Sequence, residues 1–238
     1  MTCGRIHSWE TMGLVDGPGI RTVVFMQGCR LRCKYCHNPD TWSCEGGTLT
    51  SPEEIVRKLL RFVPYYGTNG GVTFSGGEPL MQADFLAEAL TLCRSNGINT
   101  CIDTAGVGTG SYREILKNTD LVLYDVKHYT REGYRNITGQ EIDETLSFLD
   151  TVQNMGVPLW IRHVVVPSLT DSDEHLRGLH EYIGTLRGVK RVELLPYHVL
   201  GVHKYRTMGI PYPLEGIPPM EPEKLTAWQA LMNKEDLT

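Results

Sequence analysis

Strand-like and helix-like segments alternate along almost the whole chain, and this alternation limits the folds that the sequence can adopt. Six short apolar runs have the length and composition of buried strands, at 22–26, 71–75, 99–103, 121–125, 159–166 and 191–195. Helical patterns lie between most of them. Strands that alternate with helices pair in parallel through right-handed crossovers, and six such units are too few to close an eight-stranded barrel. The sequence therefore predicts an α/β fold, an incomplete (β/α)6 barrel.

The clearest helix signal begins at Ser51. Ser51 and Glu54 form the pattern of a capping box around Pro52, and an apolar stripe continues from there to Val63. Further helices are predicted at 86–97, 144–155, 171–186 and, at the end of the chain, about 221–235. Because the chain has 238 residues and no internal repeat, we expect a single domain over 1–238.

Composition limits where the protein acts, what it binds and how it uses its cysteines. The chain has no run of 18 apolar residues and no leader pattern, so we expect no membrane contact and a cytoplasmic location. Its net charge of −5 argues against nucleic-acid binding. Seven unevenly placed cysteines suit metal or redox chemistry in a reducing compartment better than a disulfide framework. We expect a monomer.

Three of these cysteines are crowded into a loop at 28–38, directly after the first predicted strand. Cys29, Cys33 and Cys36 supply thiolates for a soft metal, but a structural zinc site needs four ligands. A non-catalytic zinc-binding module would take His37 or Cys44 as its fourth ligand. Three ligands alone would leave one metal position open for chemistry, as in a four-iron cluster.

Polar or glycine residues also follow the other predicted strands, where the active sites of parallel barrels collect. They are Gly76, Gly77 and Glu78 after the second, Asp103 and Thr104 after the third, Asp125 and Lys127 after the fourth, and His198 after the last. Individually they fit turns, caps or solvated charges. Arg162 lies inside the fifth strand, where burial demands an anionic or carbonyl partner.

The spacing C-x3-C-x2-C, with Tyr35 before the last cysteine, resembles the signature of the radical S-adenosylmethionine (SAM) family. The resemblance implies a TIM-like barrel of the radical SAM type and a [4Fe–4S] cluster on Cys29, Cys33 and Cys36. In this family the open iron chelates SAM, and reductive cleavage gives methionine and a 5′-deoxyadenosyl radical that abstracts hydrogen. The segment at 75–79 is similar to the glycine-rich motif that holds the SAM amino group.

Longer segments resemble one branch of the family, the glycyl radical enzyme activases. They lie at 4–8, 15–21, 27–29, 35–38, 40–42, 160–167 and 193–198. The resemblance implies hydrogen abstraction from a backbone glycine of pyruvate formate-lyase, with flavodoxin or ferredoxin as electron donor. Relatives with other partners carry a cysteine-rich insertion, whereas 37–70 holds only Cys44. Ala105 departs from the asparagine expected there.

The same resemblance implies roles for individual residues. SAM contacts fall on Tyr35, His37, Gly76, Gly77, Glu78, Asp103, Lys127 and His198. A monovalent cation, Na⁺ or K⁺, would use Asp103, Thr104, the Leu123 carbonyl and Asp125. Beyond the resemblance, we expect Asp16 and Arg162 to guide the protein substrate. The alternatives are the activase of anaerobic ribonucleotide reductase, a small-molecule radical SAM enzyme and the zinc module.

Overall fold

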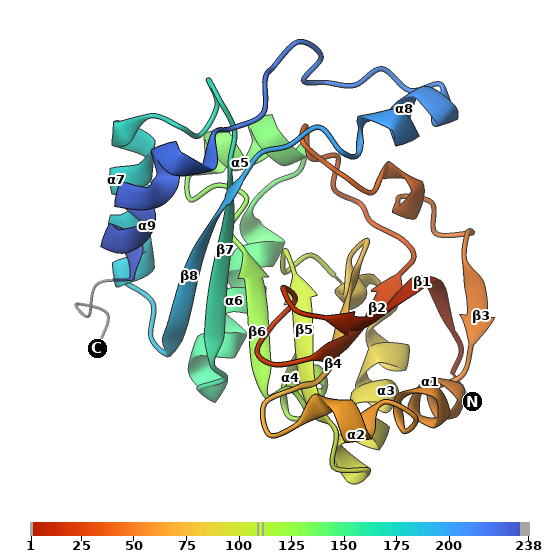
Figure 1. Cartoon of the computed structure of the whole chain (residues 1–238). Coiled ribbons are helices and arrows are strands. Elements are labelled where there is room, and N and C mark those ends of the chain that lie inside the picture. The colour runs from red at the N-terminus through yellow and green to blue at the C-terminus, as the bar shows by residue number, and fades with distance from the viewer. Residues whose placement is uncertain (1, 109, 111, 234–238) are drawn as a thin grey trace.

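One curved sheet of eight strands organises the computed structural model, which describes residues 2–108, 110 and 112–233 (Figure 1). Its strand order is β3-β1-β2-β4-β5-β6-β7-β8. The strands are β1 (Gly4–Gly13), β2 (Arg21–Met26), β3 (Thr48–Thr50), β4 (Gly71–Gly76), β5 (Asn99–Thr104), β6 (Leu121–Asp125), β7 (Leu159–Val165) and β8 (Val189–Pro196). From β2 to β8 all neighbours are parallel, which confirms the six predicted strands.

β1 and β3 were not predicted, and they extend the sheet with antiparallel pairs beyond β2. β1 is half exposed and its pairing with β2 shifts register twice. Its apolar residues therefore do not alternate cleanly, and the period-two signal that reveals a strand is lost. β3 has only three residues. Both strands form the amino-terminal margin of the sheet.

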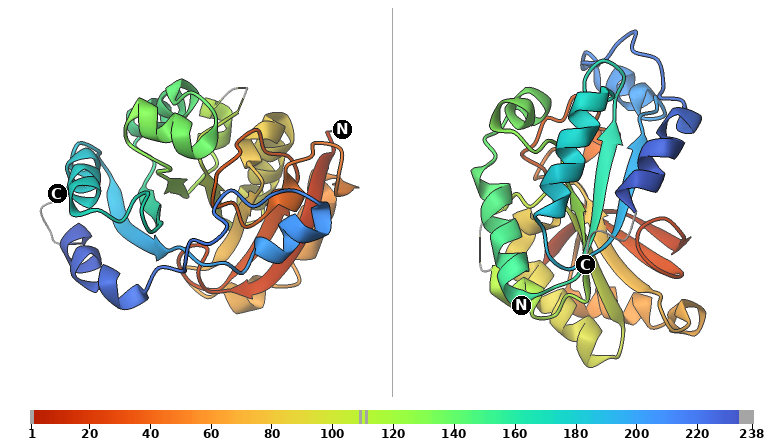
Figure 2. Two further views of the ribbon diagram at one scale, coloured as in Figure 1. Left: turned by 90° about the horizontal axis from the view of Figure 1, so that it is seen from above. Right: turned by 90° about the vertical axis from the view of Figure 1, so that its left-hand side faces the viewer.

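Most of the helices cover the outer face of the sheet, as the view from above shows (Figure 2). The helices of the described residues are α1 (Pro52–Leu59), α2 (Val63–Tyr66), α3 (Ala83–Ser95), α4 (Tyr112–Leu116), α5 (Arg131–Thr138), α6 (Asp143–Met155), α7 (Asp173–Gly184), α8 (Val202–Met208) and α9 (Thr226–Met232), with 3-10 turns η1 (Pro39–Thr41), η2 (Pro79–Gln82) and η3 (Pro222–Leu225). No helix in the described part of the chain is long and apolar enough to cross a membrane.

Two predicted helix boundaries need correction. The capping box at Ser51 and Glu54 is present, but α1 ends at Leu59, and Val63 is exposed rather than part of its stripe. Pro64 has no N–H to donate to a continuing α1 but is tolerated in a first helical turn, so the chain restarts as α2 with Pro64 in that turn. The helix predicted at 221–235 consists of η3 followed by α9, and residues 234 and 235 lie outside the described residues.

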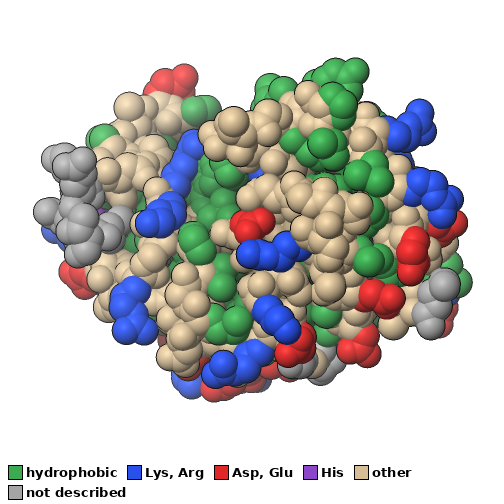
Figure 3. All heavy atoms as spheres, turned by 90° about the horizontal axis from the view of Figure 1, so that it is seen from below, with side chains coloured by type: hydrophobic (Ala, Val, Ile, Leu, Met, Phe, Trp, Pro, Cys, Tyr) green, Lys and Arg blue, Asp and Glu red, His purple; other side chains and the backbone are tan. Residues whose placement is uncertain are grey.

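The barrel is open because β8, at the end of the strand order, pairs only with β7 within the described residues. Inward-facing side chains fill its lower part, where Cys101, Leu123 and Trp160 form a small buried cluster. The opposite, carboxyl end carries the cysteine loop and α8. Figure 3 shows the face seen from below, over which Lys and Arg side chains are interspersed with Asp and Glu. Because side chains fill the lower part of the barrel, a site can form only at the carboxyl end.

Candidate active site

A cavity of about 490 Å³ occupies the carboxyl end of the barrel. Residues from all six parallel strands or the loops after them line it. Every predicted SAM contact lines the cavity: Tyr35, His37, Gly76, Gly77, Glu78, Asp103, Lys127 and His198. So do Cys29, Cys33, Cys36, Asp16, Thr104, Asp125 and Arg162, whereas Leu123 does not. Leu123 lies below, in the cluster with Cys101 and Trp160.

The cysteine loop is irregular, and backbone hydrogen bonds to other parts of the chain hold it. The amide of Cys29 donates to the carbonyl of Trp42 at 3.3 Å, and the amides of Arg32 and Lys34 donate to the last turn of α5 at 2.9 and 3.0 Å. This fixed backbone presents Cys29, Cys33 and Cys36 to one cavity. Cys44 is exposed and does not line it, so the structure does not bring a fourth thiol to the three.

Burial controls the protonation of these thiols. It raises the pKa of Cys29 and of Cys33 to about 12, and it also raises the pKa of Cys36. Thiols this basic need a bound metal to become thiolates near neutral pH. No group of three His, Cys, Asp or Glu side chains among the described residues is arranged around a single ion. A three-cysteine set fits a cluster, which spreads its ligands over separate irons.

Gly76 and Gly77 allow two backbones to approach each other. A Cβ on Gly76, whose φ is +107°, would lie 2.3 Å from the Met26 nitrogen, and one on Gly77 would lie 2.4 Å from the Gly28 carbonyl oxygen. The Glu78 amide then donates to that same carbonyl at 2.9 Å. The glycines were predicted to allow the close approach of a ligand. In the structure they allow the close approach of the chain between Met26 and Gly28, where the cysteine loop begins. These contacts place the glycine-rich segment at 75–79 and the cysteine loop at 28–38 side by side in one wall of the cavity.

Glu78 is fully buried and its carboxylate already has partners. It accepts hydrogen bonds from the Leu80 amide at 3.1 Å, the Ala105 amide at 2.9 Å and the Thr104 hydroxyl at 2.5 Å. Burial nevertheless raises the pKa of Glu78 to about 7. The Thr104 hydroxyl is therefore turned toward Glu78 rather than toward Asp125, with which it was predicted to share a cation.

Arg162 reaches into the cavity among three carboxylates. Its nitrogens lie 3.4 Å from Asp103, 3.8 Å from Asp16 and 3.8 Å from Asp125, which confirms that the buried guanidinium has anionic partners. Asp125 also pairs with Lys127 at 2.7 Å. Burial raises the pKa of Asp103 to about 6, whereas Lys127 and Arg162 overcome the same burial effect at Asp125 and hold its pKa below the usual value.

Several buried polar atoms around this group have no hydrogen-bond partner. They include Oδ1 of Asp103 together with Nε and Nη1 of Arg162. Unpaired polar atoms are costly in a closed interior, but they suit a surface that contacts a polar or charged ligand. SAM carries amine, sulfonium, carboxylate and ribose groups, so this part of the cavity fits it.

Sequence reasoning missed Ser75 and Trp42, both of which line the cavity. The Ser75 hydroxyl donates to Asp103 at 2.6 Å, and its inward phase at the end of a strand was a usable signal. Trp42 carried no such signal because its place depends on the turn η1. No residue predicted for the site, Leu123 excepted, lies away from the cavity.

Comparison with known proteins identifies the family of the chain. The Radical SAM superfamily profile matches residues 23–179, which include the cysteine loop and the glycine segment. The chain belongs to the radical SAM superfamily. The radical SAM family uses a [4Fe–4S] cluster and SAM, which agrees with the three-cysteine cavity and excludes the zinc-module alternative.

Curated relatives define the branch of the radical SAM superfamily. The chain is 58% identical to the pyruvate formate-lyase-activating enzyme of Clostridium pasteurianum, covering 94% of both chains. It is 46% identical to the enzyme of that name from Listeria monocytogenes, covering 97% of this chain and 95% of the relative. Such identities over nearly full length show membership of the activating-enzyme family.

Solved radical SAM structures share the fold at lower identity. A domain of pyruvate-formate lyase-activating enzyme from Bacteroides vulgatus is 22% identical and covers 68% of this chain and 92% of its own, with a TM-score of 0.55. QueE from Escherichia coli is 16% identical and covers 92% and 94%, with a TM-score of 0.54. These likenesses confirm the incomplete barrel.

Proposed function

We propose that this enzyme activates pyruvate formate-lyase by removing a hydrogen atom from one of its backbone glycines, with SAM as the consumed co-substrate. The observation that carries the proposal is the convergence of three thiols and the Asp103–Arg162 group on one open cavity. The curated relatives named pyruvate formate-lyase-activating enzyme support the choice of partner over anaerobic ribonucleotide reductase or a small molecule.

Cys29, Cys33 and Cys36 would hold the cluster, which supplies the electron that cleaves SAM. The remaining residues bind and orient. Asp103, whose Oδ1 accepts no hydrogen bond among the described residues, would accept one from SAM. Lys127, paired with Asp125, would place a positive charge near the SAM carboxylate. The stacked His37 and His198 would line the ribose side. The buried wall around Tyr35 and Glu78 would keep water away from the reacting atoms.

Asp16 and Arg162 would guide the substrate glycine. Both line the cavity, and Asp16 belongs to the segment between β1 and β2. The open barrel provides a route that a polypeptide loop can use, because no strand bridges β8 to the other margin of the sheet in the described residues. A loop entering there would exchange hydrogen bonds with an Asp–Arg pair that is only loosely engaged at 3.8 Å.

A Na⁺ or K⁺ ion at Asp103 and Asp125 is part of the proposal. In the present side-chain arrangement the Arg162 guanidinium lies against both carboxylates, and Thr104 is bonded to Glu78. A cation there would have to displace Arg162 and rotate Thr104. Potassium-dependent SAM affinity, measured against a non-coordinating cation such as tetramethylammonium, tests this step.

The deciding experiment is anaerobic electron paramagnetic resonance on the iron-reconstituted, reduced enzyme mixed with SAM and pyruvate formate-lyase. We expect the signal of a glycyl radical on the partner. A cluster signal that shifts with SAM but yields no glycyl radical would keep the radical SAM chemistry and reject the partner. Flavodoxin or ferredoxin as donor, a monomeric state and a cytoplasmic location stay predictions, and the first two can be tested with the same preparation.

A further inference from the structure

Trp42 stands next to the cysteine loop without any role in the function proposed above. It caps η1, the short turn at Pro39–Thr41, and it lines the cavity together with Cys36. Its indole nitrogen is buried and has no hydrogen-bond partner. A buried N–H without a partner is uncommon in native proteins and calls for an explanation.

The side chains of Trp42 and Cys36 line the same cavity, from the two ends of the short segment 36–42. Among the described residues the buried indole N–H has no acceptor, and the neutral Cys36 thiol does not serve as one. A metal-bound thiolate is a stronger acceptor and would satisfy the donor.

The outer face of Trp42 is covered by a positive charge. The guanidinium carbon of Arg32 lies 4.6 Å from the ring centroid, within the range of a cation–π contact. Arg32 is exposed, and its Nη1 donates to the carbonyl of Cys29 at 2.8 Å. One exposed cation thus contacts both the backbone of Cys29 and the ring of Trp42.

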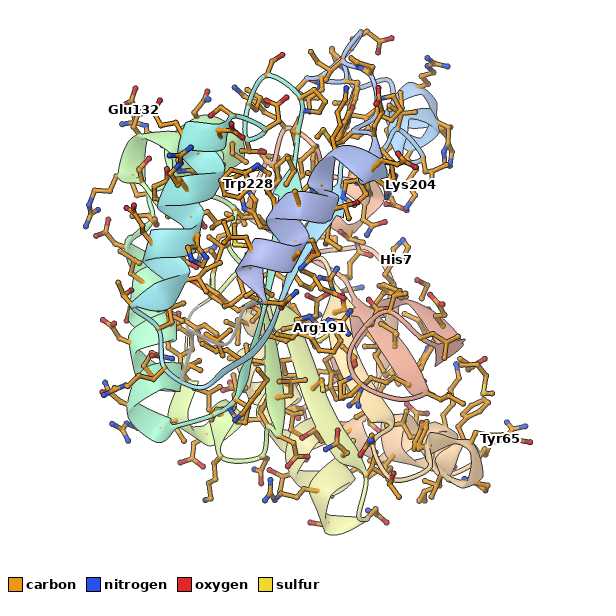
Figure 4. The ribbon with its side chains drawn as sticks, turned by 60° about the vertical axis from the view of Figure 1, so that its left-hand side comes forward. His7, Tyr65, Glu132, Arg191, Lys204 and Trp228 are labelled. Atoms are coloured by element: carbon orange, nitrogen blue, oxygen red, sulfur yellow. The ribbon has the colours of Figure 1, made fainter. Side chains whose placement is uncertain are left out.

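Neighbouring contacts hold the indole in place from several sides. Tyr205 meets Trp42 edge to face at 5.8 Å, and its hydroxyl donates to the Cys36 carbonyl at 3.1 Å. Asp40, two residues before Trp42, pairs with His7 of β1 at 3.1 Å and with Lys204 of α8 at 3.0 Å. Figure 4 labels His7 and Lys204, which lie on the same side of the molecule. A turn fixed this firmly can aim a side chain.

We propose that Trp42 donates an N–H···S hydrogen bond to Cys36 as a cluster ligand and, together with Arg32, raises the reduction potential of the cluster. Hydrogen bonds to ligand sulfurs and nearby positive charge stabilise the reduced, more negative state of an iron–sulfur centre. The inference rests on the cluster of the proposed function. It assigns this chain's Trp42 a tuning role that is separate from SAM binding and from recognition of the partner.

Redox titration followed by electron paramagnetic resonance tests the inference on the reconstituted full-length enzyme. We expect Trp42→Phe to move the midpoint potential to a more negative value with unchanged iron and sulfide content, and Arg32→Gln to move it in the same direction. The chain contains a matched pair elsewhere, since Lys58 lies 3.7 Å over the ring of Trp9. Trp9→Phe and Lys58→Gln should leave the potential unchanged.

A Trp42→Phe enzyme with a full cluster and the wild-type potential would overturn the inference. If that variant loses its cluster, the hydrogen bond is tested on the wild-type enzyme instead. Electron–nuclear double resonance with an isotopic label on the indole nitrogen should detect coupling to the reduced cluster, and the absence of coupling would reject the hydrogen bond. A wild-type protein that binds no iron would overturn the proposed function as well, so the two failures are distinguishable.

Discussion

The imidazole rings of His37 and His198 stack with 3.9 Å between their centroids, although the two residues are 161 positions apart in the chain. His37 follows the last cysteine of the loop, and His198 follows β8, so the stack connects the two ends of the cavity wall. Burial lowers the pKa of His37 to about 4, and it lowers the pKa of His198 as well. Both rings are therefore neutral at pH 7 and do not repel each other.

His198→Ala should weaken SAM binding by up to about tenfold. The variant loses the stack with His37 that would line the ribose side of the site, and a stacked aromatic pair contributes roughly 0.5–1.5 kcal/mol. The affinity can be measured anaerobically from the SAM-induced change in the spectrum of the reduced cluster. His203→Ala is the control, since His203 is exposed on α8 in the same segment. Equal losses in the two variants would remove His198 from the SAM site.

Serine at Cys29, Cys33 or Cys36 should abolish cluster assembly, because each position would lose a thiolate that one iron requires. Cys44→Ser should assemble a normal cluster, since Cys44 is exposed and lies outside the cavity. Iron and acid-labile sulfide per chain measure the outcome. Loss of iron in Cys44→Ser would contradict the three-ligand arrangement.

Gly77→Ala should destabilise the fold by about 1–3 kcal/mol and impair cluster binding, because its methyl group would meet the Gly28 carbonyl at 2.4 Å. Gly184, the last residue of α7, offers a matched control with nothing within 4 Å of an added methyl group. Gly184→Ala should be neutral or stabilising by up to about 1 kcal/mol. Thermal unfolding and iron content of both variants test the comparison, and equal behaviour would show that the close approach at Gly77 is not needed.

Glu78 should make the metal-free protein less stable as the pH rises. Its pKa is about 7 when folded against a usual value of 4.5, so the folded state holds a proton that the unfolded state releases between these values. Stability contributed by the protonated form is complete below pH 4.5 and is lost as the pH rises toward 7. At about 1.4 kcal/mol per pH interval of one, the loss amounts to roughly 3 kcal/mol at most.

Denaturant unfolding at a series of pH values measures that loss. Glu78→Gln should flatten the dependence, although the raised pKa of Asp103 leaves part of the slope in the same direction. Glu132→Gln is the control, because Glu132 is exposed on α5. A slope that survives unchanged in Glu78→Gln would show that this carboxyl ionises normally.

Asp16→Asn should lower glycyl radical formation on the partner without lowering SAM cleavage. The charge that faces Arg162 at 3.8 Å disappears, so we expect at least about tenfold less glycyl radical on the partner, the factor that 1.4 kcal/mol represents. SAM cleavage without the partner should continue at the wild-type rate. Glu10→Gln, on the exposed part of β1, should change neither quantity. A parallel fall in both reactions would place Asp16 in SAM binding instead.

The parallel part of the fold and the location of the cavity were predictable because both follow from local patterns. Buried parallel strands are short apolar runs, and their carboxyl ends carry the chemistry. Asp103, Asp125 and His198 were found in this way. The orientation of Thr104 toward Glu78 was not predictable, since the choice between two acceptors depends on tertiary packing. The same holds for Trp42, which the turn at η1 places on the cavity wall together with Cys36.

The open barrel leaves two sheet margins, and margins with unpaired backbone groups can recruit strands from other chains and seed aggregation. One margin, β3, is only three residues long. The other, β8, has its backbone paired by side chains, because the amides of Val192 and Leu194 donate to Asn233 at 3.1 Å and to Gln229 at 2.8 Å. It also carries the exposed Lys190 and Arg191. A short margin and a charged one both oppose edge-to-edge pairing. The opening proposed to admit a substrate polypeptide is thus flanked by margins that disfavour strand pairing with another copy of the enzyme.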